Sequence, residues 1–161
     1  MDAAVLININ TNPAEALVLL DRENARLNQL CATLEAMADA LPAAIGSVET
    51  IDILKSTASA LDRHIELQEI ILFPCLRRGA NTSFHLEGAL RQLEYEHCAD
   101  KALIIEIIET AMRPPPAAAR FVTEPFGYLL RLFFECYRRH SAWENEVLVP
   151  SLHDITRLND Q

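Results

Sequence analysis

Apolar residues recur at helical spacing in long segments of the chain, which short polar or proline-rich stretches separate. Spacings of three and four residues place these side chains along one face of a helix. The pattern predicts helices over about 13–40, 47–78, 83–112 and 123–152. Pro13 suits a first helical position, and the prolines at 114–116 break the chain before the last helix. Amphipathic helices joined by short loops predict one all-α domain over residues 1–161, an antiparallel up-down-up-down four-helix bundle.

The second and fourth predicted helices carry a repeated pattern. HIELQEIILFPCL begins at His64, and HSAWENEVLVPSL begins at His140. In both copies the His is followed eight residues later by Leu, ten later by Pro and twelve later by Leu. Four residues after the His, however, the first copy has Gln68 and the second has Glu144. Such a long repeat predicts that the bundle is built from two similar helical hairpins.

The repeated His residues are candidates for metal chemistry. Residues four apart share one face of a helix, so His140 and Glu144 point the same way, as do His64 and Gln68. Apolar residues in register with them place this face toward the interior. A buried His and a buried carboxylate are costly unless they are paired or bind a metal. Both are common ligands of iron, zinc and manganese. Because packed helices lie about 8–10 Å apart, side chains from several of them can meet at one point.

Composition and charge narrow the classes of partner. The net charge of −9 argues against nucleic acid, whose phosphates need a basic surface. The start of the chain has no basic region typical of a secretory signal, and no apolar run approaches the roughly 20 residues that span a bilayer. The four cysteines show no CxxC spacing and are expected to be reduced thiols. We therefore expect a cytoplasmic protein without a nucleic-acid or membrane partner; its oligomeric state stays open.

This constellation resembles the hemerythrin-like, or HHE cation-binding, family over about residues 14–152. HIELQEIILFP and HSAWENEVLVP resemble the family's runs on the second and fourth helices, and EYEH resembles its third-helix His motif. In that family a four-helix bundle holds a non-heme di-iron centre. The resemblance implies four metal ligands in this chain: His64, His97, His140 and Glu144. The ligand set is degenerate, because Asn24 and Gln68 stand where the family has a His and a Glu.

The missing ligands predict at most one tightly bound metal. Two divalent ions need anionic compensation, and Glu144 is the carboxylate that remains in the implied set. We expect Lys101, one turn after His97, to face the same interior, where its ammonium would repel a second cation. The remaining residues suit mononuclear iron, with zinc as the next choice. Asn24, Gln68 and Lys101 are then vacant ligand positions or direct neighbours of the ligands.

Several functions stay open at this point. The first is a metal-binding bundle that senses oxygen, nitric oxide or redox state or handles iron, with a diatomic ligand or a protein as its partner. The second is a metal-free interaction module in which Lys101 pairs with Glu144 inside a polar network with Asn24 and Gln68. The third is a mononuclear iron oxidoreductase, and a role other than catalysis is favoured over it. A two-metal site completed by other acids is a further alternative.

The other acids and thiols are expected to lie off the centre. Glu69 follows His64 by five residues and lies about 100° beyond Gln68 on a regular α-helix, off the face that His64 and Gln68 share. Glu23 and Glu96 each precede an inward position and are expected to face solvent or a helix interface. Cys31 and Cys136 are expected to border the site as small apolar packing residues.

Overall fold

The computed structural model describes residues 13–42, 45–79, 84–113 and 120–159. Over these residues the chain forms helices and turns and has no strand. The elements are α2 (Pro13–Asp39), α3 (Val48–Glu66), the π-helix η1 (Leu67–Leu72), α4 (Phe73–Gly79), α5 (Phe84–Met112) and α6 (Arg120–Asn159). Because α3, η1 and α4 follow one another directly, they build one long helix. The all-α prediction is confirmed.

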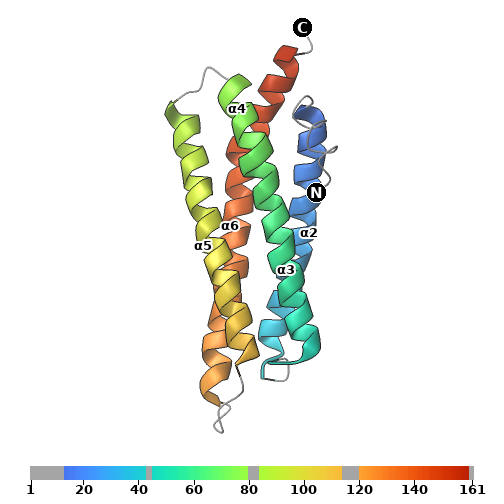
Figure 1. The fold of residues 1–161 in the computed structure, drawn as a ribbon, viewed down its shortest axis with the longest axis vertical. Coiled ribbons are helices and arrows are strands. Elements are labelled where there is room, and N and C mark those ends of the chain that lie inside the picture. The colour runs from blue at the N-terminus through green and yellow to red at the C-terminus, as the bar shows by residue number, and fades with distance from the viewer. Residues whose placement is uncertain (1–12, 43–44, 80–83, 114–119, 160–161) are drawn as a thin grey trace.

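The helices run antiparallel side by side as a bundle (Figure 1). Helix α2 packs against α3 and α6, and α5 packs against the same two neighbours. Each of these long helices therefore borders two others around a common axis. This arrangement allows side chains from every long helix to reach the centre.

The turn into α3 shows why this helix begins where it does. Gly46 has a φ of 75°, a left-handed conformation that glycine adopts without a Cβ clash. Ser47 then caps the helix, because its side-chain oxygen accepts a hydrogen bond of 3.1 Å from the backbone N–H of Thr50. Helix α3 therefore begins at Val48, directly after this cap.

Two boundaries differ from the prediction. The last helix begins at Arg120 and ends at Asn159, so it is longer at both ends than the predicted 123–152. Pro125 and Pro150 lie inside this helix. The second predicted helix is interrupted by the π-helical segment η1, which hydrophobic spacing alone did not indicate.

A polar layer separates two hydrophobic clusters along the bundle. One cluster includes Leu34, Leu61, Ile107 and Phe133, and the other includes Leu20, Phe73 and Leu93. The buried polar layer consists mainly of Asn24, His64, Gln68, His97, Asp100, His140, Ser141 and Glu144. Apolar burial above and below this layer fixes the register of the helices and therefore the positions of the polar side chains.

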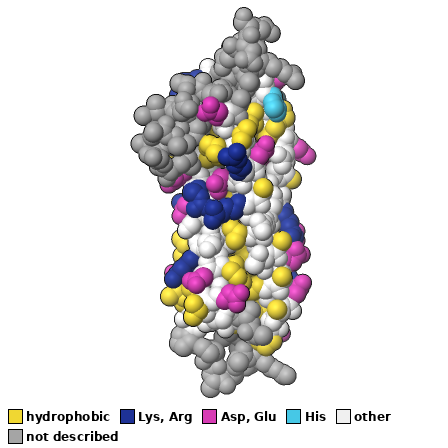
Figure 2. All heavy atoms as spheres, turned by 90° about the vertical axis from the view of Figure 1, so that its right-hand side faces the viewer, with side chains coloured by type: hydrophobic (Ala, Val, Ile, Leu, Met, Phe, Trp, Pro, Cys, Tyr) yellow, Lys and Arg dark blue, Asp and Glu magenta, His cyan; other side chains and the backbone are white. Residues whose placement is uncertain are grey.

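The surface is of mixed charge on the face shown in Figure 2. Acidic side chains and Lys or Arg side chains are interspersed there among apolar ones. Within the described ranges, no helix carries a stretch with the length and apolar character needed to cross a membrane.

Matched substitutions in α6 test the role of the hydrophobic core. Leu130 is fully buried, whereas Leu132 is 52% exposed. We expect Leu130→Ala to lower the free energy of unfolding by about 2–5 kcal/mol, because it removes buried methyl groups and leaves a cavity. Leu132→Ala should change it by less than about 0.5 kcal/mol. Urea denaturation of the two variants would measure both values, and equal losses would contradict the described packing.

Candidate metal centre

Four side chains from three helices converge in the polar layer. His64 comes from α3, His97 from α5, and His140 and Glu144 from α6. One ligand atom of each lies within 4.8 Å of the corresponding atoms of the other three. All four residues are at most 1% exposed. Four ligands at about 2.1 Å from a tetrahedral ion are about 3.4 Å apart, so small side-chain movements would fit one ion among them.

Glu144 lies at the centre of this cluster. Its Oε1 is 2.9 Å from Nε2 of His64 and 2.6 Å from Nε2 of His140. The side-chain amide of Gln68 donates a hydrogen bond to the same oxygen. Burial alone raises the pKa of Glu144, but the two imidazoles outweigh burial and hold this pKa well below its ordinary value. Glu144 is therefore an ionised carboxylate in the interior of the bundle.

The outer nitrogens of two imidazoles face carboxylates. Nδ1 of His97 is 2.7 Å from Oε1 of Glu69. Nδ1 of His140 lies 3.3 Å from Oε2 of Glu96 and 3.7 Å from Oδ2 of Asp100. Metal-binding imidazoles characteristically place their second nitrogen against such an acceptor, which fixes the ring and its tautomer. For His97 the nitrogen left for the centre is then Nε2, whereas Nδ1 of His140 lies near its carboxylates without forming a hydrogen bond to a described residue.

His97 is neutral at pH 7 in this environment. Burial, together with the nearby His140 and His64, lowers the pKa of His97 to about 3. Its Nε2 is buried and has no hydrogen-bond partner among the residues that the structure describes. A buried acceptor without a partner is unfavourable, whereas a neutral imidazole nitrogen is a good metal ligand. This atom fits a bound cation.

His140 has a different electrostatic environment. Burial opposes its charge, but Glu144, Asp100 and Glu96 outweigh burial and raise the pKa of His140 above its ordinary value. Its Nε2 is close to Glu144 yet forms no well-directed hydrogen bond, because the carboxylate lies off the direction of the ring N–H. A cation bound here would displace the proton on Nε2 and take its place beside the carboxylate.

The first helix contributes an amide to the centre. Asn24 donates a hydrogen bond of 3.1 Å from Nδ2 to Oε2 of Glu144. Its Oδ1 accepts a hydrogen bond of 3.1 Å from the hydroxyl of Tyr137. The sequence pattern did not indicate this polar contact of Tyr137. Asn24 is thus held as a bridge between Tyr137 and the central carboxylate.

A comparison with known families bears on this geometry. The model of the hemerythrin HHE cation-binding domain matches residues 15–152. The chain belongs to this family. No significant match was found among curated proteins or among solved structures. The predicted resemblance is confirmed, and a cluster of three imidazoles and one carboxylate in this HHE domain is compatible with metal binding.

One predicted neighbour of the HHE cluster is placed elsewhere. Lys101 is 47% exposed at its side chain and pairs with Asp62 at 2.7 Å. The expectation that it faces the interior, or pairs with Glu144, is wrong. The inward stripe of α5 runs through Leu93, His97, Asp100 and Ile104, so the residue three after His97 is buried and the residue four after it is not.

Three acids lie near the cluster. Glu69 was expected to point away from it, but Glu69 contacts the outer nitrogen of His97. Glu96 was expected to face solvent or a helix interface, and it lies between α5 and α6, where it contacts the outer nitrogen of His140. Asp100 was not considered, although alternating spacings of three and four on α5 would have placed it inward. Burial raises the pKa of Asp100 to about 6.

The two thiols near the cluster are not suited to metal binding as they stand. Cys31 is buried in the hydrophobic core, where burial raises its pKa to about 12. Burial also raises the pKa of Cys136, which is partly exposed. Both thiols are therefore protonated at pH 7, and Cys31 is a small packing group of the hydrophobic core, as expected.

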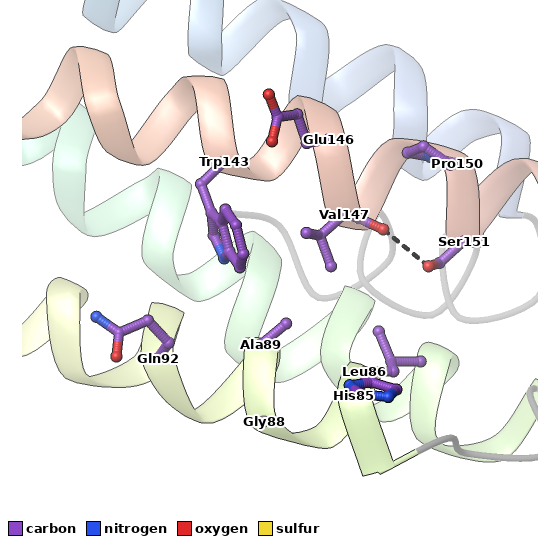
Figure 3. Close-up of a pocket in the computed structure, with 10 residues that line it drawn as sticks. All are labelled: His85, Leu86, Gly88, Ala89, Gln92, Trp143, Glu146, Val147, Pro150 and Ser151. Carbon is purple, nitrogen blue, oxygen red and sulfur yellow. Dashed lines mark hydrogen bonds between the residues drawn. The ribbon is translucent and has the colours of Figure 1, made fainter.

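A separate surface pocket of about 440 Å³ lies between α5 and α6 (Figure 3). Trp143 and Val147 line it from α6, and His85 and Ala89 line it from α5. Trp143 is adjacent in sequence to Glu144, but Glu144 points into the bundle. The pocket therefore does not include the imidazole and carboxylate cluster.

The lowered pKa of His97 predicts how the metal-free protein responds to acid. Between about pH 6.5 and pH 3 the unfolded chain binds a proton at this residue and the folded chain does not, so stability is lost as pH falls. Replacing His97 by Gln removes this contribution. The stability difference between His97→Gln and the original chain should therefore shift in favour of the variant on acidification, by up to about 1.4 kcal/mol per pH unit.

Urea denaturation in the presence of a chelator from pH 7 to pH 4 would measure this difference. The comparison isolates His97, because His140, whose pKa is raised, is present in both proteins. A difference that does not change with pH would show that His97 titrates normally in the folded protein.

Proposed function

We propose that this protein holds a single non-heme metal ion, iron in the first place and zinc in the second, between His64, His97, His140 and Glu144. In this proposal it acts in the cytoplasm, where its four unpaired cysteines stay reduced, as a sensor of oxygen, nitric oxide or redox state or in iron handling. The observation that carries the proposal is the buried convergence of three imidazoles and one carboxylate within 4.8 Å.

The hydrogen bonds of Glu144 support one ion rather than two. A carboxylate that bridges two metals uses both of its oxygens. Here Oε2 accepts a hydrogen bond from Asn24, and Oε1 is shared by His64, His140 and Gln68. A second cation would also lack the carboxylate that Gln68 replaces. The amides therefore occupy the positions that a second metal would need.

Burial of the cluster favours a diatomic ligand over a larger substrate. Because each of the four residues is at most 1% exposed, a large molecule could not reach the centre without opening the bundle. Three imidazoles and one carboxylate leave coordination positions open on an iron ion, and these supply binding of a diatomic molecule and a change of redox state. A sensing role therefore suits the site better than the alternative of an iron oxidoreductase.

A metal-free interaction module is the second candidate. Every oxygen of Glu144 already has a partner within the protein, and Tyr137 completes the chain of contacts through Asn24. Such a network stabilises a buried charge without a metal. The orphaned Nε2 of His97 counts against this candidate, because nothing in the network uses it.

Metal content and stability distinguish these functions. We expect the purified full-length protein to bind one equivalent of iron or zinc per chain, and metal at 100 times its Kd to raise the free energy of unfolding by about 2.7 kcal/mol. His140→Ala should remove most of this binding. His153→Ala is the matched control, because His153 is an exposed residue of the same helix. Full metal occupancy in His140→Ala would place the site elsewhere, and indifference of the melting temperature to metal would favour the interaction module.

Restoring the missing ligands tests why one metal is expected. The double variant Asn24→His and Gln68→Glu supplies an imidazole and a second carboxylate, which together compensate a second cation. We expect its metal content to rise from one equivalent toward two. The control variant Asn28→His and Gln29→Glu makes the same chemical changes at exposed positions and should leave the stoichiometry at one. Two equivalents in the unmodified protein would refute the single-metal proposal.

A further inference from the structure

The two copies of the repeat carry their acid at different positions. After the His, the first copy has Gln68 followed by Glu69, and the second has Glu144 followed by Asn145. The order of amide and acid is therefore reversed. In the second copy the acid enters the cluster, while Asn145 is exposed and its side-chain amide donates to the carbonyl of Ser141 on its own helix.

The π-helix changes where the first copy's acid points. On a regular α-helix, consecutive residues are about 100° apart, so Gln68 and Glu69 could not both serve one interior site. Within η1 the turn is widened, as shown by the hydrogen bond from the N–H of Phe73 back five residues to the carbonyl of Gln68. Gln68 contacts Glu144, and Glu69 contacts His97.

Proline alone does not explain the widened turn. Pro74 has no N–H to donate to the carbonyl four residues before it, which weakens the α-helical pattern at this point. Pro150, however, stands at the same spacing in the second copy, where α6 remains α-helical. The π-helix therefore occurs in the first copy, whose acid stands one position later, and not in the second copy.

Two contacts hold the ring of His97 in place. Oε1 of Glu69 lies 2.7 Å from Nδ1, and the ring of Phe73 stacks on the imidazole with centroids 5.9 Å apart and planes 6° apart. A carboxylate accepts a hydrogen bond, so this contact keeps the proton on Nδ1. The lone pair of Nε2 is then directed into the bundle, where it has no partner among the described residues.

We propose that Glu69, brought to His97 by the π-helix η1, is a positioning residue that keeps His97 in the tautomer whose Nε2 binds the metal. The inference rests on the proposed metal-binding function. Position 68 has an amide, and the acid of this copy stands one residue later at Glu69. There it acts on the proposed metal site through the imidazole of His97. Glu69 is 38% exposed at its side chain, so it can be replaced without opening the core.

The tautomer is measured first, in the metal-free protein. In full-length protein labelled with ¹⁵N, the ring nitrogens of His97 should report protonated Nδ1 and unprotonated Nε2. Glu69→Ala should shift this signature toward protonated Nε2 or a mixture of tautomers. Glu69→Gln should preserve it, because an amide oxygen also accepts a hydrogen bond. Glu66→Ala is the control, since it removes the same charge from an exposed position in the same long helix.

Zinc affinity is measured next in the same proteins, by competition with a chelating dye. We expect Glu69→Ala to bind Zn²⁺ about 10–100-fold more weakly, the usual effect of losing a partner behind a metal-binding His. Glu69→Gln should stay within a few-fold of the original chain, and Glu66→Ala should match it.

The outcomes separate this inference from the proposed function. An unchanged His97 tautomer in Glu69→Ala, or equal loss of affinity in Glu69→Ala and Glu69→Gln, overturns the role of Glu69. Failure of the unmodified protein to bind Zn²⁺ or iron overturns the metal-binding function. The NMR measurement on metal-free protein would still test whether Glu69 fixes the tautomer of His97.

Discussion

The buried carboxylate of Glu144 is the constraint on which the centre of this bundle depends. An ion taken out of water costs several kcal/mol unless its surroundings compensate it. Here the compensation comes from several helices at once, through Asn24 on α2, His64 on α3, Gln68 on η1 and His140 on α6. Because these contacts meet at the two oxygen atoms of Glu144, they fix how each contributing helix is rotated about its axis and where it lies along the bundle.

Apolar packing and the polar layer therefore support each other. The hydrophobic clusters on either side supply most of the burial and exclude water from the centre. Exclusion of water in turn determines the protonation of the imidazoles: burial and neighbouring imidazoles keep His97 neutral, while the surrounding carboxylates favour the charged form of His140. Two chemically identical side chains thus have opposite properties because they face different neighbours.

Most of the carboxylates around the proposed cation lie behind the imidazoles and not among the candidate ligands. One carboxylate lies among the candidate ligands, and three others lie near the outer nitrogens of His97 and His140: Glu69, Glu96 and Asp100. Carboxylates in this position increase the donor strength of the imidazoles. The arrangement suits one cation held by strong neutral donors better than two cations bridged by carboxylates. Glu144 lies among the candidate ligands and Glu69 lies behind His97, because the order of amide and acid is reversed in the first copy of the repeat.

Much of the fold was predictable from the sequence because the helices are long and strongly periodic. A His that repeats at fixed spacing on apolar faces must enter the interior, whatever the details of the loops. The same reasoning placed Lys101 inward and did not consider Asp100, although positions three and four residues after His97 both border the inward face. The slow rotation of the apolar stripe along α5, set by its packing on α3 and α6, decides which of the two is buried.

By itself, the sequence determined the helical bundle and the inward faces that carry the repeated His residues, because periodicity and the cost of exposing apolar faces act within each helix. The set of His64, His97, His140 and Glu144 was implied by the resemblance to the HHE family. Only the tertiary structure decided the π-helical turn at Leu67–Leu72, the contact of Glu69 with His97 and the pairing of Lys101 with Asp62. The two side-chain contacts each join residues of different helices, and no local pattern of the sequence records such a partner.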